Sequence, residues 1–472
     1  MRTFLASSLV VMACIMTLTQ CRWLEVDPDQ YILAEDALKT PEDLQALLVS
    51  CYDVLANLYD GDVQLINELR SDNTAQPASN FDFKAIYDRE TIRWTSYVGG
   101  VNRDFFYPVL RVNSLLESFD LIEGLTPEDR TRIEAEAKFV RAFCFWGAVK
   151  IFAQPYGYTS DNSHLGIPLP IAVREEPYPR STVADTYAQI EQDLNDAVDG
   201  LPEENGVYAT KDAAKALLAS IHFLKMEYAQ AAELATEVIE TGRYQLEFQE
   251  EDTMFMRLRL PQGEIGSETI FGTYSYIENN DNRADQFSQW WLPTSNPELT
   301  LSRDFHTWFS QLIAVESGSS QDRRAQWYEY NATENKVYLK RFSEYNNFNI
   351  PLLHLTQMML IRAEALAESG GDLSQAIADI NAIRNRAGIE ADAYLLSANA
   401  SPEQVIQAAR TEYRKETIGM GMWVEQLQRR GAQGEDIVIR DAPWDCPGMA
   451  LQFSASEGNV EGFVFNEVGG CD

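Results

Sequence analysis

Aromatic side chains concentrate in one stretch of the chain. Four of its nine tryptophans fall between residues 290 and 327: Trp290, Trp291, Trp308 and Trp327. Sugar rings present flat C–H faces that stack on such rings, while their hydroxyl groups require polar partners. The same region supplies further rings and polar groups, namely Tyr274, Tyr276, Asn279, Asn280, Asn282, Arg283 and Gln289. The stretch therefore predicts a stacking surface for sugars, and the alternative for each ring is a place in the core.

A second loop region, residues 72–100, offers the next candidates. It carries Trp94 and the polar pair Asp72 and Asn73. We therefore expect the ligand-binding residues to come first from Trp290, Trp291, Trp327, Tyr274 and Tyr276, and then from Trp94, Asp72 and Asn73.

Catalytic motifs are missing from the sequence. The four histidines are dispersed, and the chain has no H-E-x-x-H, G-x-S-x-G, Walker loop, G-x-G-x-x-G or C-x-x-C motif. Glycosidases need two carboxylates, but among 72 acidic residues no spacing singles out a pair. The acidic segment 280–285 lacks the glycine and final glutamate of a calcium-binding EF-hand loop. The sequence favours a binding protein without cofactor or metal over an enzyme.

The amino-terminal residues predict export. Arg2 precedes an apolar run over residues 4–18, which is too short to span a bilayer and is typical of a signal peptide. Cys21 follows directly, as in a bacterial lipoprotein, although Gln20 replaces the usual small residue. We expect a signal over 1–20, lipidation at Cys21 and a tether over 21–34. The alternative is an ordinary cleaved signal followed by a coincidental cysteine.

Charge and cysteine content narrow the class further. A net charge of −34 disfavours binding to nucleic acid. Cys51 and Cys144 lie in apolar helical patterns and read as core thiols. Cys446 and Cys471 flank a short tail, and an oxidising compartment favours a disulfide between them over two free thiols.

The elements that must position these residues are mainly helical. Residues 211–242 and 351–388 look like one unit used twice, with small residues where two antiparallel helices approach. This is a degenerate tetratricopeptide pattern, whose units bury their faces only by stacking. Residues 134–152 with 182–200 supply another pair. Residues 245–345 break the helical rhythm, and 265–276 have strand character. Long excursions of this kind are usually functional.

Basic residues within these helices have acidic residues nearby. Internal ion pairs between helices, rather than a ligand site, are therefore predicted for Lys138, Arg141, Arg362, Arg384 and Arg414.

Several ordered segments resemble the SusD/RagB family of outer-membrane nutrient-binding lipoproteins from Bacteroidota. The start at Cys21 and its acidic, proline-containing tether fit that family. The helix signature and connector are similar to EAEAKFVRAF at 134–143, GIPL at 166–169 and RSTV at 180–183. The later motifs are similar to IRAEA at 361–365, INAIRNRAG at 380–388 and EYRKE at 412–416. These are scaffold motifs, so they indicate the fold and the role of the protein but do not identify its ligand.

The resemblance implies a mostly α fold, with tetratricopeptide-like helix pairs, an irregular region containing minor β, and a single binding domain over 35–472. It implies a non-catalytic lipoprotein on the cell outer membrane, facing the exterior. Such a protein captures oligosaccharides and passes them to a SusC-like TonB-dependent transporter. The alternatives are oligopeptide capture within the same family and a scaffold that binds another protein.

Overall fold

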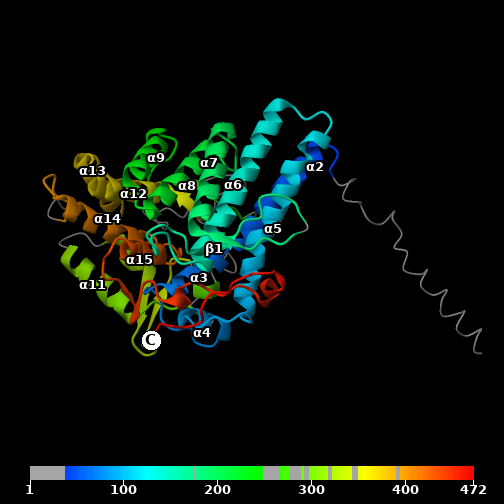
Figure 1. The fold of residues 1–472 in the computed structure, drawn as a ribbon. Coiled ribbons are helices and arrows are strands. Elements are labelled where there is room, and N and C mark those ends of the chain that lie inside the picture. Colours follow the sequence, from blue (N-terminus) through cyan, green and yellow to red (C-terminus); the bar gives the residue numbers. More distant parts are fainter. Residues whose placement is uncertain are drawn as a thin grey trace, which may run out of the picture.

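The computed structural model describes residues 38–174, 176–247, 266–275, 289–291, 297–316, 322–342, 349–389 and 394–471. The predicted signal, Cys21, the tether and Tyr276 lie outside these residues. The expectation of a mostly helical chain with minor β structure is confirmed (Figure 1). No helix within the described ranges is both long enough and apolar enough to cross a membrane.

The helices form two groups along the chain. The first comprises α2 (Pro41–Leu58), α3 (Asp62–Arg70), α4 (Phe81–Tyr87), α5 (Ser96–Ser118), α6 (Pro127–Phe152), α7 (Val183–Gly200), α8 (Lys211–Leu224) and α9 (Tyr228–Glu240). The second comprises α11 (Arg303–Glu316), α12 (Leu355–Ser369), α13 (Leu373–Arg386), α14 (Pro402–Glu416) and α15 (Trp423–Ala432). Thus α4 and the start of α5 occupy part of the region 72–100 that the sequence indicates as loop.

Helix pairs stack into one row, as the repeat pattern predicts. Helix α2 packs on α5, α5 on α6, α6 on α7, α7 on α8 and α8 on α9. Helix α9 packs on α12, which also contacts α13 and α14, so the row continues across the excursion (Figure 1). Each pair leaves an apolar face that the next pair covers, which is why the units are stable only together.

Helix ends follow local sequence signals. Thr126 caps α6 by accepting a hydrogen bond from the Asp129 amide, and Pro127 follows it at the first helical position. Gly370 ends α12 in the left-handed conformation, at φ 74°, where a residue with a side chain is strained. The tight turn that joins α12 to α13 therefore depends on this glycine.

The strands form small antiparallel pairs. They are β1 (Leu165–Pro168) with β2 (Arg180–Thr182), β3 (Thr269–Thr273) with β6 (Ile350–His354), β4 (Tyr328–Asn331) with β5 (Lys336–Leu339), and β7 (Val438–Ile439) with β8 (Ala442–Pro443). The strand expected within 265–276 is thus confirmed as β3. Its pairing with β6 aligns Thr269 with His354 and joins the start of the excursion to the entry of α12.

Buried apolar residues from the whole row form a continuous core. Cys51 of α2 and Cys144 of α6 are fully buried free thiols within it, as predicted. The basic residues singled out in the helices form ion pairs between helices as predicted, except Arg414, whose partner Asp72 lies in the loop after α3. Each forms an ion pair inside the fold: Lys138 with Glu134 and Asp196, Arg141 with Asp193, Arg362 with Asp379, Arg384 with Glu412, and Arg414 with Asp72.

A larger cluster of charges lies in the interior where the excursion meets α14. Arg324 is completely buried, and its guanidinium lies 2.8 Å from a carboxylate oxygen of Asp322 and 2.8 Å from one of Glu412. It also lies 2.7 Å from a carboxylate oxygen of Glu416. Buried charges are tolerated only when paired in this way.

The cluster extends to a second arginine on α13. Arg386 contacts Glu416 at 2.7 Å and Glu268, next to β3, at 2.5 Å. Thr356 of α12 donates a hydrogen bond of 2.7 Å to Glu268. The buried charge cluster therefore joins the excursion, β3 and three helices of the second group.

Electrostatics within the cluster favour the charged forms of Arg324 and Glu412. Burial opposes the charged form of Arg324, but the neighbouring acids outweigh it and raise the pKa of this guanidinium further. Burial likewise opposes ionisation of Glu412, yet Lys415, Arg324 and Arg384 hold its pKa well below the usual range. Removing one member leaves its partners charged and unpaired in a dry interior.

We predict that Arg324→Ala lowers the free energy of unfolding by about 3–5 kcal/mol, because three carboxylates lose their shared partner. The control is Arg130→Ala, which removes an exposed ion pair with Asp120 and should cost less than about 1 kcal/mol. Urea unfolding followed by circular dichroism measures both. Equal losses in the two variants would contradict the structural role of the cluster.

Candidate functional site

Two tryptophans expected on a stacking surface are core residues. Trp291 is 1% exposed and Trp327 is 5% exposed. The guanidinium of Arg341 lies 4.1 Å from the Trp327 ring centre, inside the fold. Trp290 is half-buried and packs edge-on against Phe83 at 5.0 Å. The prediction that Trp291 and Trp327 face a ligand is wrong for this structure, because neighbouring elements cover both rings.

The polar pair Asp72 and Asn73 also has internal partners. Asn73 is completely buried and accepts a hydrogen bond of 3.0 Å from Arg414. Asp72 pairs with the same arginine at 3.0 Å and accepts from the indole of Trp423 at 2.9 Å. The expected ligand contact is corrected for Asn73, since its carboxamide serves to join two parts of the chain. The carboxylate of Asp72 likewise joins two parts of the chain through Arg414 and Trp423.

Trp94 behaves differently from the other candidates. It is 78% exposed and lies beside a cavity of about 760 Å³. Three separate segments enclose this cavity: residues 93–110 around the start of α5, the connector at 168–178, and the tail at 453–460. We call it the α5 groove. The structure therefore favours Trp94 over Trp291 and Trp327 as a ligand-binding candidate.

The floor of the α5 groove comes from the first turns of α5. Gly99 and Gly100 line it without side chains, and a Cβ at Gly100 would meet no other atom within 4 Å. Asn102 also lines it and is 2% exposed. Its Nδ2 has no hydrogen-bond partner among the described residues. An unpaired buried donor costs roughly 1–3 kcal/mol, which a ligand or a water offering an acceptor recovers.

Aromatic rings form the sides of the α5 groove. Trp94 and the exposed ring of Tyr107 belong to the first segment, and the half-buried Tyr178 belongs to the connector. Tyr178 is held in place, because its hydroxyl donates 2.8 Å to the carbonyl of Ala172 and the Arg174 guanidinium stacks 3.4 Å from its ring centre. Rings fixed before binding lose little entropy when a ligand arrives.

Polar groups of both signs reach the rim. Arg93 and Arg103 come from the first segment, and Ser454, Ser456 and Glu457 come from the tail. Burial raises the pKa of Glu457 above its usual value. Rings with hydroxyl, carboxyl and guanidinium groups around them match the two-sided chemistry of a sugar.

The tail that forms one wall is tied to the rest of the fold at several points. The Ala455 amide donates 3.0 Å to the carbonyl of Arg93, next to Trp94. The Leu451 amide donates 3.0 Å to the carbonyl of Ile151 at the end of α6. These contacts place residues 453–460 opposite the start of α5.

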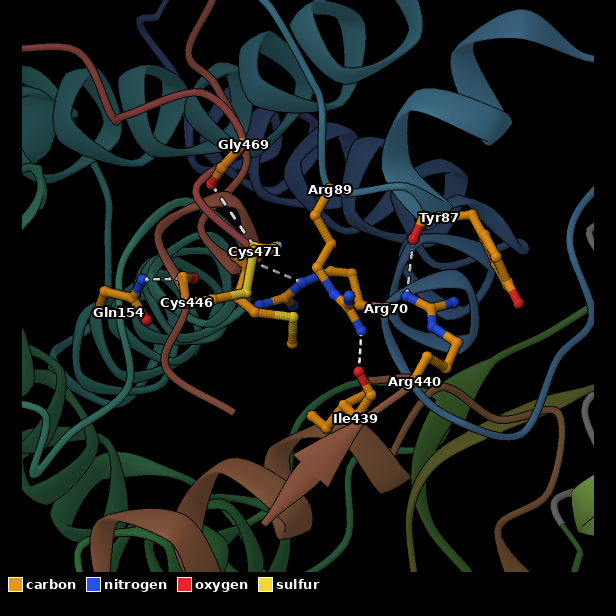
Figure 2. Close-up of a disulfide and its surroundings, with 10 residues drawn as sticks. Arg70, Tyr87, Arg89, Gln154, Ile439, Arg440, Cys446, Gly469 and Cys471 are labelled. Carbon is orange, nitrogen blue, oxygen red and sulfur yellow. Dashed lines mark hydrogen bonds between the residues drawn. A yellow bond between two sulfur atoms is a disulfide. The ribbon is translucent and has the colours of Figure 1, made fainter. Parts of the chain in front are cut away.

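A disulfide joins the two ends of the tail, the pairing that the sequence favours. Figure 2 shows Cys446 and Cys471, whose Cα atoms are 5.2 Å apart. Side chains around the disulfide donate hydrogen bonds to backbone carbonyls. Gln154 donates 3.1 Å to the carbonyl of Cys446. Nearby, Arg440 donates 2.8 Å to the carbonyl of Tyr87. Arg70 adds a bond of 3.1 Å to the Met449 carbonyl. The bridge and these hydrogen bonds hold the groove wall to the helical row.

One acidic cluster has the spacing of a metal site, but its side chains already form ion pairs with protein groups. Glu191, His222 and Glu227 bring their ligand atoms close together. The ammonium of Lys225 lies 2.5 Å from Glu191 and 3.0 Å from Glu227. His222 contacts Glu227 at 2.5 Å. These side chains satisfy one another and do not indicate a cation.

Sequence reasoning proposed Trp94 because it lies in an aromatic segment with little helical pattern. It missed the tail and the connector, because nothing in their local composition shows that they fold onto α5. Two sequence features could have indicated that these segments are structured: the proline content of the connector and the cysteines that flank the tail.

The stacked helix pairs define a mostly helical fold, and two family models match the chain. A model described as starch-binding and associating with the outer membrane matches residues 22–223. The SusD family model matches residues 266–436. Together these two models span most of the chain, which belongs to the SusD family.

Individual relatives are distant in sequence. A SusD-like protein from Formosa agariphila is 25% identical over 236 residues, which cover 48% of this chain and 44% of the relative. A SusD superfamily protein from Bacteroides thetaiotaomicron has a TM-score of 0.76 at 22% identity, over 91% of this chain and 100% of that one. The surface glycan-binding protein A of Bacteroides uniformis has a TM-score of 0.71 at 17% identity, over 90% and 99%. These structural matches show the shared fold.

We predict that replacing both Cys446 and Cys471 by serine lowers the free energy of unfolding by about 3 kcal/mol. The bridge spans 25 positions in sequence, and opening a loop of this length returns entropy to the unfolded chain. Chemical unfolding with and without reductant measures the loss, and the reduced wild type should match the double variant. Two alkylatable thiols at these positions in folded, exported protein would reject the bridge.

Proposed function

We propose that this protein captures an oligosaccharide in the α5 groove at the cell surface. The observation that carries the proposal is the exposed Trp94 ring beside a cavity whose floor contains the unpaired Asn102 amide. Membership of a carbohydrate-binding family supports the same chemistry. A sugar ring stacks on Trp94 or Tyr107, and a hydroxyl oxygen accepts from Asn102.

The groove has room for more than one sugar ring. A volume of about 760 Å³ falls within the range of pockets that enclose drug-sized ligands. Its rings Trp94, Tyr107 and Tyr178 come from the first segment and the connector, so affinity rests on a few stacking contacts rather than on closure. Each such contact contributes ~1–2 kcal/mol. We therefore expect dissociation constants of roughly micromolar to millimolar.

The proposed role is to hold the glycan and deliver it to a SusC-like TonB-dependent transporter. The family model that describes association with the outer membrane supports this location. In the proposal, residues 1–20 direct export, Cys21 carries the lipid, residues 21–34 form a tether, and residues 35–472 form one binding domain. The tether lets the binding domain sit above a transporter in the same membrane.

We predict that Trp94→Ala weakens binding of an oligosaccharide about 5- to 30-fold, which corresponds to ~1–2 kcal/mol. Isothermal titration calorimetry against a glycan panel identifies a ligand for the wild type and then measures the variant. Phe81→Ala is the matched control, because Phe81 is 79% exposed and does not line the groove. It should bind as the wild type does. Unchanged binding by Trp94→Ala would place the ligand elsewhere.

We predict that Cys21→Ala abolishes membrane anchoring, because the acyl chains attach through this thiol. The measurement is fractionation of cells that express each form, with mass spectrometry of the mature amino terminus. The wild type should appear in the membrane fraction with an acylated first residue, and the variant should be released or unprocessed. Membrane fractionation of the variant like that of the wild type would count against a lipoprotein.

A further inference from the structure

A second pocket has a lining entirely separate from that of the α5 groove. It has a volume of about 210 Å³, and its lining residues come from α2, from the loop before α8, from β3 with Tyr274 directly after it, and from β6. None of them lines the α5 groove. We call it the β3 pocket. The sequence candidate Tyr274 lies here, half-buried at the end of β3.

Aromatic rings dominate one side of the β3 pocket. The rings of Tyr52 and Tyr208 pack at 4.9 Å between centres. Tyr52 is fixed, since its hydroxyl donates 2.9 Å to Glu136 and accepts 3.2 Å from the Ala209 amide. Tyr208 is half-buried and leans on this fixed ring. The pair forms a rigid apolar surface of the kind that a flat ring stacks on.

Besides its tyrosine hydroxyls, the β3 pocket is lined by the polar side chains of Thr273 and Asp53. Thr273 is 3% exposed, and its Oγ1 has no hydrogen-bond partner in the part of the chain that the structure describes. Asp53 of α2 is exposed and contributes a carboxylate. Val49 of the same helix is also exposed, so the pocket reaches the surface along α2. A buried hydroxyl without a partner is a cost that a bound polar group removes.

We infer that the β3 pocket binds a single neutral sugar ring, either a free monosaccharide or the end residue of a longer glycan. This inference rests on the proposed function for its ligand class. Its volume lies below the 300 Å³ at which pockets for drug-sized ligands begin, about right for one ring. One face of the sugar stacks on the Tyr208 side. Its hydroxyl groups pair with Thr273 and Asp53.

The experiment uses the methyl glycosides of glucose, galactose and mannose as probes. Saturation-transfer difference NMR finds which of them binds the wild type, and a titration gives its dissociation constant. Ala56 lines the pocket, so Ala56→Phe places a ring inside it. We expect at least a tenfold rise in the dissociation constant of the glycoside, with oligosaccharide binding in the α5 groove unchanged. Ala46→Phe, at an exposed position of α2, is the matched control and should bind as the wild type does.

Two further variants separate this inference from the proposed function. Thr273→Val removes the unpaired hydroxyl at nearly constant side-chain volume. It should raise the dissociation constant of the glycoside several-fold without lowering the melting temperature. It decides the question if Ala56→Phe does not fold. Trp94→Ala should retain glycoside binding while it loses oligosaccharide affinity. The inference is overturned if no glycoside binds a wild type that binds oligosaccharide. It is equally overturned if Ala56→Phe and Thr273→Val both bind the glycoside normally.

Discussion

The fold depends on a buried group of charges that no single segment supplies. Arg324 comes from the excursion, Glu412 and Glu416 come from α14, and Arg386 comes from α13. Taking these groups out of water is costly, and only their mutual pairing offsets the cost. The arrangement is therefore all or none: the excursion cannot leave its place without stranding carboxylates inside the second group of helices. Glu268 extends the same constraint to β3, and so to one wall of the β3 pocket.

The α5 groove follows from a different set of constraints on the same row of helices. Its three segments are far apart in sequence and are brought together by the ends of α5 and α6. The disulfide and the backbone hydrogen bonds around it keep the tail against that end of the row (Figure 2). These contacts fix the backbone around the α5 groove, and a preformed surface lowers the ordering cost of binding the proposed glycan.

The sequence predicted the scaffold well because helix periodicity, caps and small residues at helix contacts are local signals. The pairs 211–242 and 351–388, the core thiols Cys51 and Cys144, and the ion pair of Arg362 all followed from such signals. The binding surface did not, because an aromatic residue looks the same in sequence whether it faces solvent or the core. Trp291 is covered by the fold and Trp94 is not. Only the packing of segments distant in sequence distinguishes the two.

The central claim is that the exposed rings around α5 bind the glycan. A crystal structure of the protein with an oligosaccharide selected by calorimetry tests it most directly. We predict electron density for a sugar ring stacked on Trp94 or Tyr107, with a hydroxyl within hydrogen-bonding distance of Asn102. A fully occupied oligosaccharide at another surface, with the α5 groove empty, would contradict the claim.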